Sequence, residues 1–130
     1  MTAEQKKVLE FHRKYKCPIH YWKLLREKNI SQIVFSDEML NRLTLLLEEV
    51  TELTHAMKIG NLDLLADALG DILYVTYGAA VMLGIDMEDV FNEIHRSNMT
   101  KSGDAFEGKI TKGGGYEAPQ LNLILQQQDL

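Results

Sequence analysis

Five carboxylates stand at helical spacing in two neighbouring apolar stretches. Residues 45–53 carry Glu48, Glu49 and Glu52, and residues 64–75 carry Asp67 and Asp71. Because an α-helix turns about 100° per residue, side chains three or four positions apart lie above one another on one face. The acids of each stretch should therefore point in one direction, where their oxygens can bind a cation.

An antiparallel pair of these helices would gather four or five negative groups in one pocket. Mutual repulsion and desolvation there cost several kcal/mol unless a cation or protons compensate. Leucines, valine and alanines fill nearly every other direction around the acids, so we expect them to share the buried side rather than a solvated face. No cysteine or histidine pair accompanies them, which favours a hard cation, Mg²⁺, with Mn²⁺ as its substitute.

A second kind of metal site was considered because Glu52 and His55 form Glu-x-x-His, which is an element of di-iron helical bundles and suggests a di-iron site as an alternative. Such bundles need the element twice. The second candidate ends at His95 and has Asn92 in place of the glutamate. The di-iron interpretation is therefore disfavoured, and His55 is most simply a surface histidine or a neighbour of the metal ligands.

Basic and amide groups crowd into residues 95–101, HRSNMTK. Asn98 and Lys101 lie three positions apart on one side and can meet an anion such as phosphate. Cations near a helix C-terminus also favour the helix dipole, so a purely structural role is an equal alternative. Acids for Mg²⁺ together with this clamp indicate attack on a phosphoanhydride by a metal-activated water.

The apolar periodicity predicts four helices that position these groups. Helix boundaries are indicated by proline, by capping residues and by glycine. The helices are expected at about 3–15 before Pro18, from a start at Ser36 and Asp37 through to Gly60, from the cap Asn61 to Gly84, and at about 87–99 after Asp86. The third is apolar nearly all round, which predicts that it is buried centrally or shared with another subunit.

The chain beyond Lys101 changes to glycine, lysine and serine and is predicted to be a loop or wrapping tail. The glutamines at 126–128 offer too little apolar character to pack, so a frayed end is expected. No strand alternation is visible. These features predict an all-α fold: a four- to five-helix bundle with an extended C-terminal arm, in one domain over residues 1–130 with its helical body at 3–101.

Composition bounds the partners. With 14 Lys+Arg against 19 Asp+Glu, the net charge of −5 leaves no basic face for nucleic acid and no polybasic membrane patch. The longest apolar segment, residues 72–85, is shorter than the roughly 20 residues of a membrane span. The lone Cys17 and the absence of a charged leader followed by an apolar run favour a soluble protein in a reducing cytoplasm.

At these residues the chain resembles the all-α nucleoside triphosphate pyrophosphatase superfamily, which includes MazG, the dimeric dUTPases and phosphoribosyl-ATP pyrophosphohydrolase. The similarity is greatest to the branch called phosphoribosyl-ATP pyrophosphohydrolase-like or Cof-like. Four segments carry it in order: VLEFHRKY, the acidic motifs with DALGDILYVTYGAAVMLGID, HRSNMTK and GGGYEAPQLNLIL.

The resemblance implies a Mg²⁺-dependent hydrolase that cuts between the α and β phosphates of a nucleotide, as a cleaner of nucleotide pools. It implies metal ligands at Glu49, Glu52 and Asp71, a further ligand or water-activating group at Glu48, and phosphate contacts from Asn98 and Lys101. The family's second motif is Glu-x-x-Asp, and the glutamate position three before Asp71 is Ala68 in this chain. Asp67, one helical turn before Asp71, can supply the missing oxygen.

The resemblance also implies tight dimers, and the surplus apolar surface of residues 74–82 agrees with a homodimer or dimer of dimers. Stacking by Tyr21, Trp22 or Tyr74 would read the base, although Tyr21 and Trp22 can equally fill the core. Two alternatives stay open: a non-catalytic helical interaction module that keeps a structural cation, and a hydrolase of phosphoribosyl-nucleotides in histidine synthesis.

Overall fold

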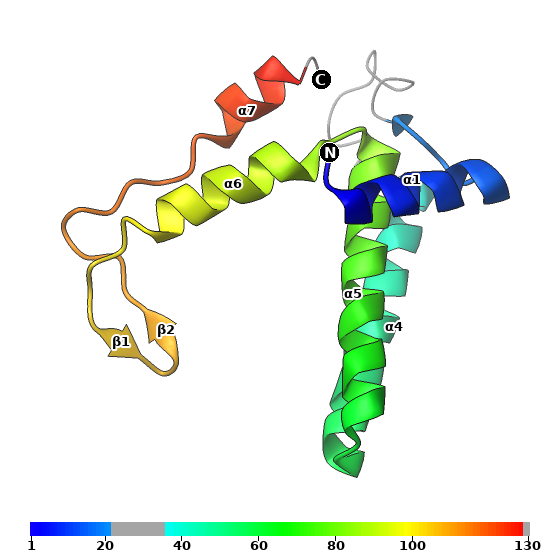
Figure 1. Cartoon of the computed structure of the whole chain (residues 1–130), viewed down its shortest axis with the longest axis horizontal. Coiled ribbons are helices and arrows are strands. Elements are labelled where there is room, and N and C mark those ends of the chain that lie inside the picture. Colours follow the sequence, from blue (N-terminus) through cyan, green and yellow to red (C-terminus); the bar gives the residue numbers. More distant parts are fainter. Residues whose placement is uncertain (22–35, 129–130) are drawn as a thin grey trace. The chain divides into compact units, whose positions relative to one another are not determined.

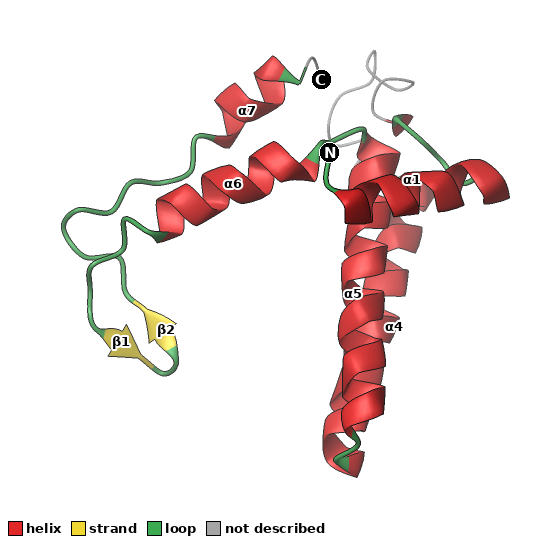
Figure 2. Cartoon of the chain, in the orientation of Figure 1, coloured by secondary structure: helices red, strands yellow, loops and turns green. Residues whose placement is uncertain are grey.

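A computed structural model describes residues 1–21 and 36–128. The described chain contains five helices and one small antiparallel sheet (Figures 1 and 2): α1 Ala3–Tyr15, α4 Asp37–Ile59, α5 Leu62–Leu83, α6 Met87–Asn98, β1 Ala105–Phe106, β2 Lys109–Ile110 and α7 Leu121–Gln127. The all-α prediction is confirmed. The chain divides into two compact units, Thr2–Ile85 and the residues from Asp86 onward with Met1, and each is described by itself.

The helix boundaries follow from local chemistry, as predicted. The Ser36 hydroxyl accepts a hydrogen bond from the Met39 amide at 3.3 Å, and the Asn61 side chain accepts one from the Leu64 amide at 3.0 Å. Gly60 and Gly84 end α4 and α5 in the left-handed region, with φ of 73° and 78°. The two-residue link between α4 and α5 forces them to run antiparallel.

The α4–α5 pair forms a long hairpin, visible side by side in Figure 1. Two pairs of residues define how the helices are aligned. Arg42 of α4 lies against Gly78 of α5. Seven residues further along α4, Glu49 lies near Asp71, which is seven residues before Gly78 on α5. A Cβ on Gly78 would lie 2.9 Å from Arg42 Nη2, so glycine makes room for the guanidinium. This register decides which side chains of the two helices meet.

The first unit is best packed where α1 crosses the hairpin. Val8, His12, Val81 and Met82 are buried there, and the Gln5 side chain donates to the Ile85 carbonyl at 2.6 Å. Along the rest of the hairpin many apolar side chains are exposed: Leu43, Leu47, Met57, Leu62, Leu69 and Leu73. Central burial of α5 is therefore wrong for the single chain, and sharing with another subunit stays a prediction.

By length and composition alone, α5 is the one described helix that could cross a membrane. It carries Asp63, Asp67 and Asp71, and it packs along α4 and α1.

His12 of α1 and Arg42 of α4 form a polar pair that joins the two helices. His12 Nδ1 is 2.9 Å from the Pro18 carbonyl oxygen, which can only accept, so Nδ1 carries the hydrogen and Nε2 faces Arg42 Nη1 at 3.5 Å. Burial lowers the pKa of His12, and the charge of Arg42 lowers it further, against the Pro18 hydrogen bond. His12 is therefore a neutral core histidine.

Acid should weaken this junction. A histidine in the unfolded chain has a pKa of about 6.5, and the folded pKa of His12 is lower, so the unfolded state takes up its proton first as the pH falls. The stability that neutral His12 contributes is present above the unfolded pKa of about 6.5 and is lost as the pH falls below it toward the folded pKa. We expect Tm to fall more steeply between pH 7 and pH 5 in the wild type than in His12→Gln. Parallel curves in thermal scans would contradict this.

The second unit contains α6, the β1–β2 hairpin and α7. The Ser97 hydroxyl donates to the Glu117 carbonyl at 2.7 Å, which ties the segment before α7 to α6. Gln128 donates to the Asp86 carbonyl and accepts from the Asp86 amide, both at 2.9 Å. The predicted fraying at 126–128 is therefore wrong, because a polar side chain anchors this end through backbone hydrogen bonds.

The small sheet was not predicted. Ala105 pairs with Ile110 and Phe106 with Lys109, across a turn at Glu107 and Gly108 that have φ of 49° and 75°. Two successive positive φ values define the two-residue turn that suits hairpins. Strands of two residues are too short to show alternation in a sequence.

Candidate metal centre

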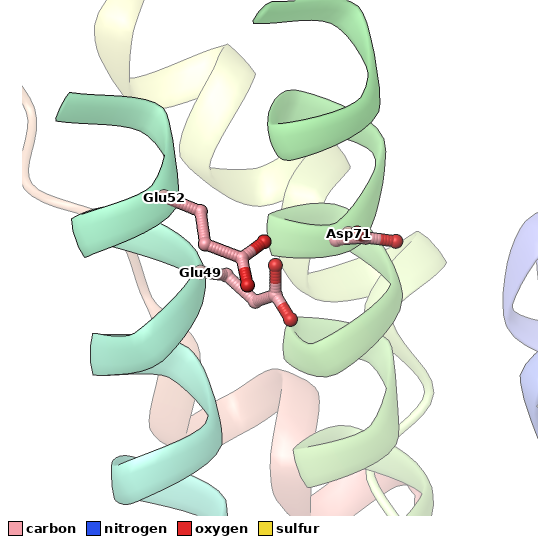
Figure 3. A group of neighbouring side chains, drawn as sticks. All are labelled: Glu49, Glu52 and Asp71. Atoms are coloured by element: carbon pink, nitrogen blue, oxygen red, sulfur yellow. The ribbon is translucent and has the colours of Figure 1, made fainter. Parts of the chain in front are cut away.

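Three of the five predicted acids come together. Glu49 and Glu52 extend from α4 toward α5, which carries Asp71 (Figure 3). Each offers a carboxylate oxygen, and the three oxygens all lie within 4.8 Å of one another. We call Glu49, Glu52 and Asp71 the carboxylate cluster. The alignment of α4 and α5 produces the cluster, because Glu49 and Asp71 each lie seven residues from the paired Arg42 and Gly78.

The acids of the cluster raise one another's pKa values. Partial burial raises the pKa of Glu49, and the negative charges of Glu52, Asp71 and Asp67 raise it further. Partial burial also raises the pKa of Asp71, with Asp67 and Glu52 adding to it and a hydrogen bond from Glu49 opposing it. Glu49 Oε2 is buried and has no hydrogen-bond partner among residues 1–21 and 36–128.

These observations fit a divalent ion. Three hard oxygen donors that repel one another, one of them buried and unpaired, are the donor set that Mg²⁺ and Mn²⁺ take in proteins. A cation would provide a partner for Glu49 Oε2 and would offset the repulsion between the three acids.

The other two acids lie beside the cluster. Glu48 is exposed and projects about 100° away from Glu49 around the helix. Asp67 is exposed too, although its charge acts on Glu49 and Asp71. The prediction that all five acids share a buried side is therefore wrong: only Glu49 and Asp71 are half-buried, because one neighbouring helix covers only one sector of α4.

A cavity of about 430 Å³ adjoins the cluster on the side of the α4–α5 turn. It is lined by Thr51, Glu52, His55, Ala56, Leu64, Asp67 and Ala68. The sequence analysis offered His55 as a surface histidine or a neighbour of the metal ligands, and it did not assign Leu64 to a site. The available signal was two small residues, Ala56 and Ala68, which face the cavity from opposite helices and are both buried.

The predicted phosphate contacts belong to the second unit. Asn98 ends α6 with an exposed side chain, and the Lys101 amide donates to the Asn98 carbonyl at 3.2 Å. The turn keeps both residues at one helix end. Their approach to the carboxylate cluster stays a prediction. Arg96 is engaged with Glu93 and lies 2.8 Å from Glu117.

The predicted base-stacking residues are only partly described. Tyr74 lies one turn beyond Asp71, half-exposed, with its ring edge-on to Phe11 at 5.6 Å between centroids. Phe11 also contacts Tyr15 at 4.6 Å. Trp22 lies outside the described residues. Tyr74 therefore belongs to an exposed aromatic group shared with α1.

Comparison with known proteins agrees with the geometry. Residues 22–98, which include the whole carboxylate cluster, match the phosphoribosyl-ATP pyrophosphohydrolase family. A 47-residue part of the chain is 49% identical to an uncharacterized protein of Acanthamoeba polyphaga mimivirus, covering 36% of this chain and 19% of the viral protein. The chain thus spans about a fifth of that relative. The chain belongs to the phosphoribosyl-ATP pyrophosphohydrolase family, within the MazG-like all-α nucleoside triphosphate pyrophosphatase superfamily.

Proposed function

We propose that this protein is a Mg²⁺-dependent nucleoside triphosphate pyrophosphohydrolase that cleaves the α–β phosphoanhydride and releases a nucleoside monophosphate and pyrophosphate. Membership of a pyrophosphohydrolase family supports hydrolysis of a nucleotide anhydride. The observation that carries the proposal is the carboxylate cluster, with its buried and unpartnered Glu49 oxygen. House-cleaning of the nucleotide pool is the role we propose.

Each residue of the site has a task in this proposal. Glu49, Glu52 and Asp71 would hold the cation, and Asp67 would add an oxygen from the next turn of α5. When bound, the cation supplies positive charge to the phosphate oxygens and lowers the pKa of a water molecule. Glu48, exposed beside Glu49, would orient that water and accept its proton.

Asn98 and Lys101 would hold phosphate oxygens. An amide and an ammonium group donate hydrogen bonds to phosphate, and they do not repel it as the acids would. The proposal therefore divides the site into an acidic part for the cation and a donor part for the anion.

A homodimer completes the proposal. Leu69 and Leu73 of α5 are 54% and 60% exposed, and Leu47 of α4 is 56% exposed. An apolar surface spread along two helices is typical of an interface with another helical face. We place the dimer in the cytoplasm, because Cys17 is a free thiol.

The direct test is ³¹P NMR of a panel of nucleoside triphosphates incubated with the full chain, with and without Mg²⁺. We expect pyrophosphate and monophosphate signals only with Mg²⁺, and the base that is accepted appears in the same spectra. Release of single orthophosphates, or turnover unchanged by a chelator, would contradict the proposal.

One observation favours a non-catalytic module as the second candidate. Ala68 is buried and apolar at the position where the family resemblance implies a glutamate. A module that kept only a structural cation would show a higher Tm with Mg²⁺ and no turnover of any nucleotide. A substrate of the phosphoribosyl-nucleotide type would instead appear as rescue of a histidine auxotroph.

A further inference from the structure

The cavity between the carboxylate cluster and the α4–α5 turn has the size of a small-molecule site. At about 430 Å³ it falls in the range of about 300–1,000 Å³ that ligand pockets occupy. It lies wholly within the first unit, between two helices that pack along their length. Glu52 belongs both to the cavity wall and to the carboxylate cluster, so a molecule in the cavity touches the cation site.

The chemistry of the described walls disfavours a phosphate. Glu52 and Asp67 are both carboxylates, and no lysine or arginine is among the described residues that line the cavity. An anion placed there would be repelled by both acids. We therefore expect the phosphate chain of a nucleotide to lie on the side of Glu52 that faces Glu49 and Asp71, and the cavity to receive a part of the substrate without negative charge.

The walls suit a flat and weakly polar group. Ala56 and Ala68, 3% and 2% exposed, leave only methyl groups at the base of the cavity, and Leu64 adds an apolar wall. The Thr51 hydroxyl already donates to the Leu47 carbonyl at 2.9 Å, so it has no hydrogen left for a sugar hydroxyl. The exposed His55 imidazole supplies the aromatic surface, on which a heteroaromatic ring can stack.

We propose that this cavity is the nucleobase pocket and that His55 is a specificity-determining residue that stacks on the base. This inference rests on the proposed function, because it places the base relative to phosphates held at the carboxylate cluster. Ala68 has a direct part in it. A longer side chain at that position would enter the cavity, whereas alanine leaves room for a ring beside the cation.

The test measures binding to the full chain in Mg²⁺ with two probes. The α,β-imido analogues of dCTP, dTTP, dATP and dGTP carry a base and resist cleavage, and inorganic tripolyphosphate carries none. Base stacking on aromatic side chains gives a gain of about tenfold or more in affinity. We therefore expect at least one analogue to bind the wild type at least about tenfold more tightly than tripolyphosphate does.

Two variants locate that gain. His55→Ala should weaken the analogue about fivefold or more and leave tripolyphosphate binding unchanged. Ala68→Leu should reduce the analogue to the level of tripolyphosphate, with its folding checked by thermal denaturation. Thr54→Ala is the matched control, since Thr54 is exposed on the same helix and outside the cavity, and it should bind both probes as the wild type does.

The imidazole of His55 gives a readout that does not depend on affinity. Its ring resonances should shift when an analogue binds and stay in place when tripolyphosphate binds. If His55→Ala binds the analogues with wild-type affinity, or if the His55 ring resonances do not shift when an analogue binds, the assignment of the nucleobase pocket is wrong.

The failures are distinguishable. If tripolyphosphate does not bind in the presence of Mg²⁺, the proposed function has failed at its cation site. If tripolyphosphate binds and the base adds no affinity, the cation site stands and the nucleobase pocket is wrong.

Discussion

Glu49→Gln should abolish turnover and the response to Mg²⁺ while leaving the fold intact. Glu49 supplies the buried oxygen that has no hydrogen-bond partner within the described part of the chain, and it lies close to Glu52 and Asp71. Loss of one preorganised electrostatic group in an active site costs about 10²- to 10³-fold in kcat. We expect a loss of at least this size in pyrophosphate release, measured at saturating nucleotide and Mg²⁺.

The same substitution should stabilise the protein without metal. The glutamine amide has nearly the shape of the carboxylate, carries no charge and can donate a hydrogen bond to a neighbouring acid. Removing one of three mutually repelling carboxylates should therefore raise Tm in a chelator. The wild type should regain stability in Mg²⁺, by about 2.7 kcal/mol at 100 times the Kd, and Glu49→Gln should not.

Glu10→Gln is the control for this substitution. Glu10 is an exposed acid of α1 outside the cluster, so its removal changes the net charge by the same amount without touching the site. We expect kcat and the Mg²⁺ response of the wild type. A Glu49→Gln protein that turns over at the wild-type rate would contradict the assignment of this residue.

Met82→Ala should cause the largest loss of stability. Met82 is fully buried, and it lies at the end of α5 where Val8 of α1 and Val81 are also buried. Truncating a core methionine removes the apolar transfer energy and leaves a cavity, which costs about 2–5 kcal/mol. Chemical unfolding in urea should show this as a lower midpoint with an unchanged m-value.

Leu73→Ala is the informative comparison. Leu73 lies on the same helix and is 60% exposed, so in an isolated chain its truncation should change stability by no more than about 0.5 kcal/mol. In a homodimer that covers this face, the loss should be larger and should depend on protein concentration. A Met82→Ala protein as stable as the wild type would contradict the placement of the core at the α1 junction.

The helices were predictable because their ends are encoded locally. Ser36 and Asn61 each accept a hydrogen bond from an amide three residues on, and Gly60 and Gly84 adopt the left-handed conformation that favours glycine. Such signals need no knowledge of the rest of the chain. The β1–β2 hairpin was missed because two pairs of residues show no periodicity.

The composition of the site was less predictable than its location. The spacing correctly brought Glu49, Glu52 and Asp71 together, since residues at helical spacing on adjacent antiparallel helices must meet somewhere along the hairpin. The rotation of α4 about its axis decides which acids are covered, and it depends on packing such as that of Arg42 against Gly78. No local pattern reports that rotation.

The cavity depends on the same packing. Its base exists because Ala56 and Ala68 face it from opposite helices, a relationship that requires the register of the hairpin. In the sequence, Ala68 was noted only because it occupies the position where the family resemblance implies a glutamate. In the structure it is a buried methyl group that lines the cavity together with Ala56.

Binding of Mn²⁺, followed by the loss of its free-ion signal in electron paramagnetic resonance, tests the carboxylate cluster most directly. The wild type should take up Mn²⁺ and release it when Mg²⁺ is added, whereas Glu49→Gln and Asp71→Asn should leave the free-ion signal unchanged. Equal uptake by the wild type and both variants would show that the ion binds elsewhere and would contradict the account.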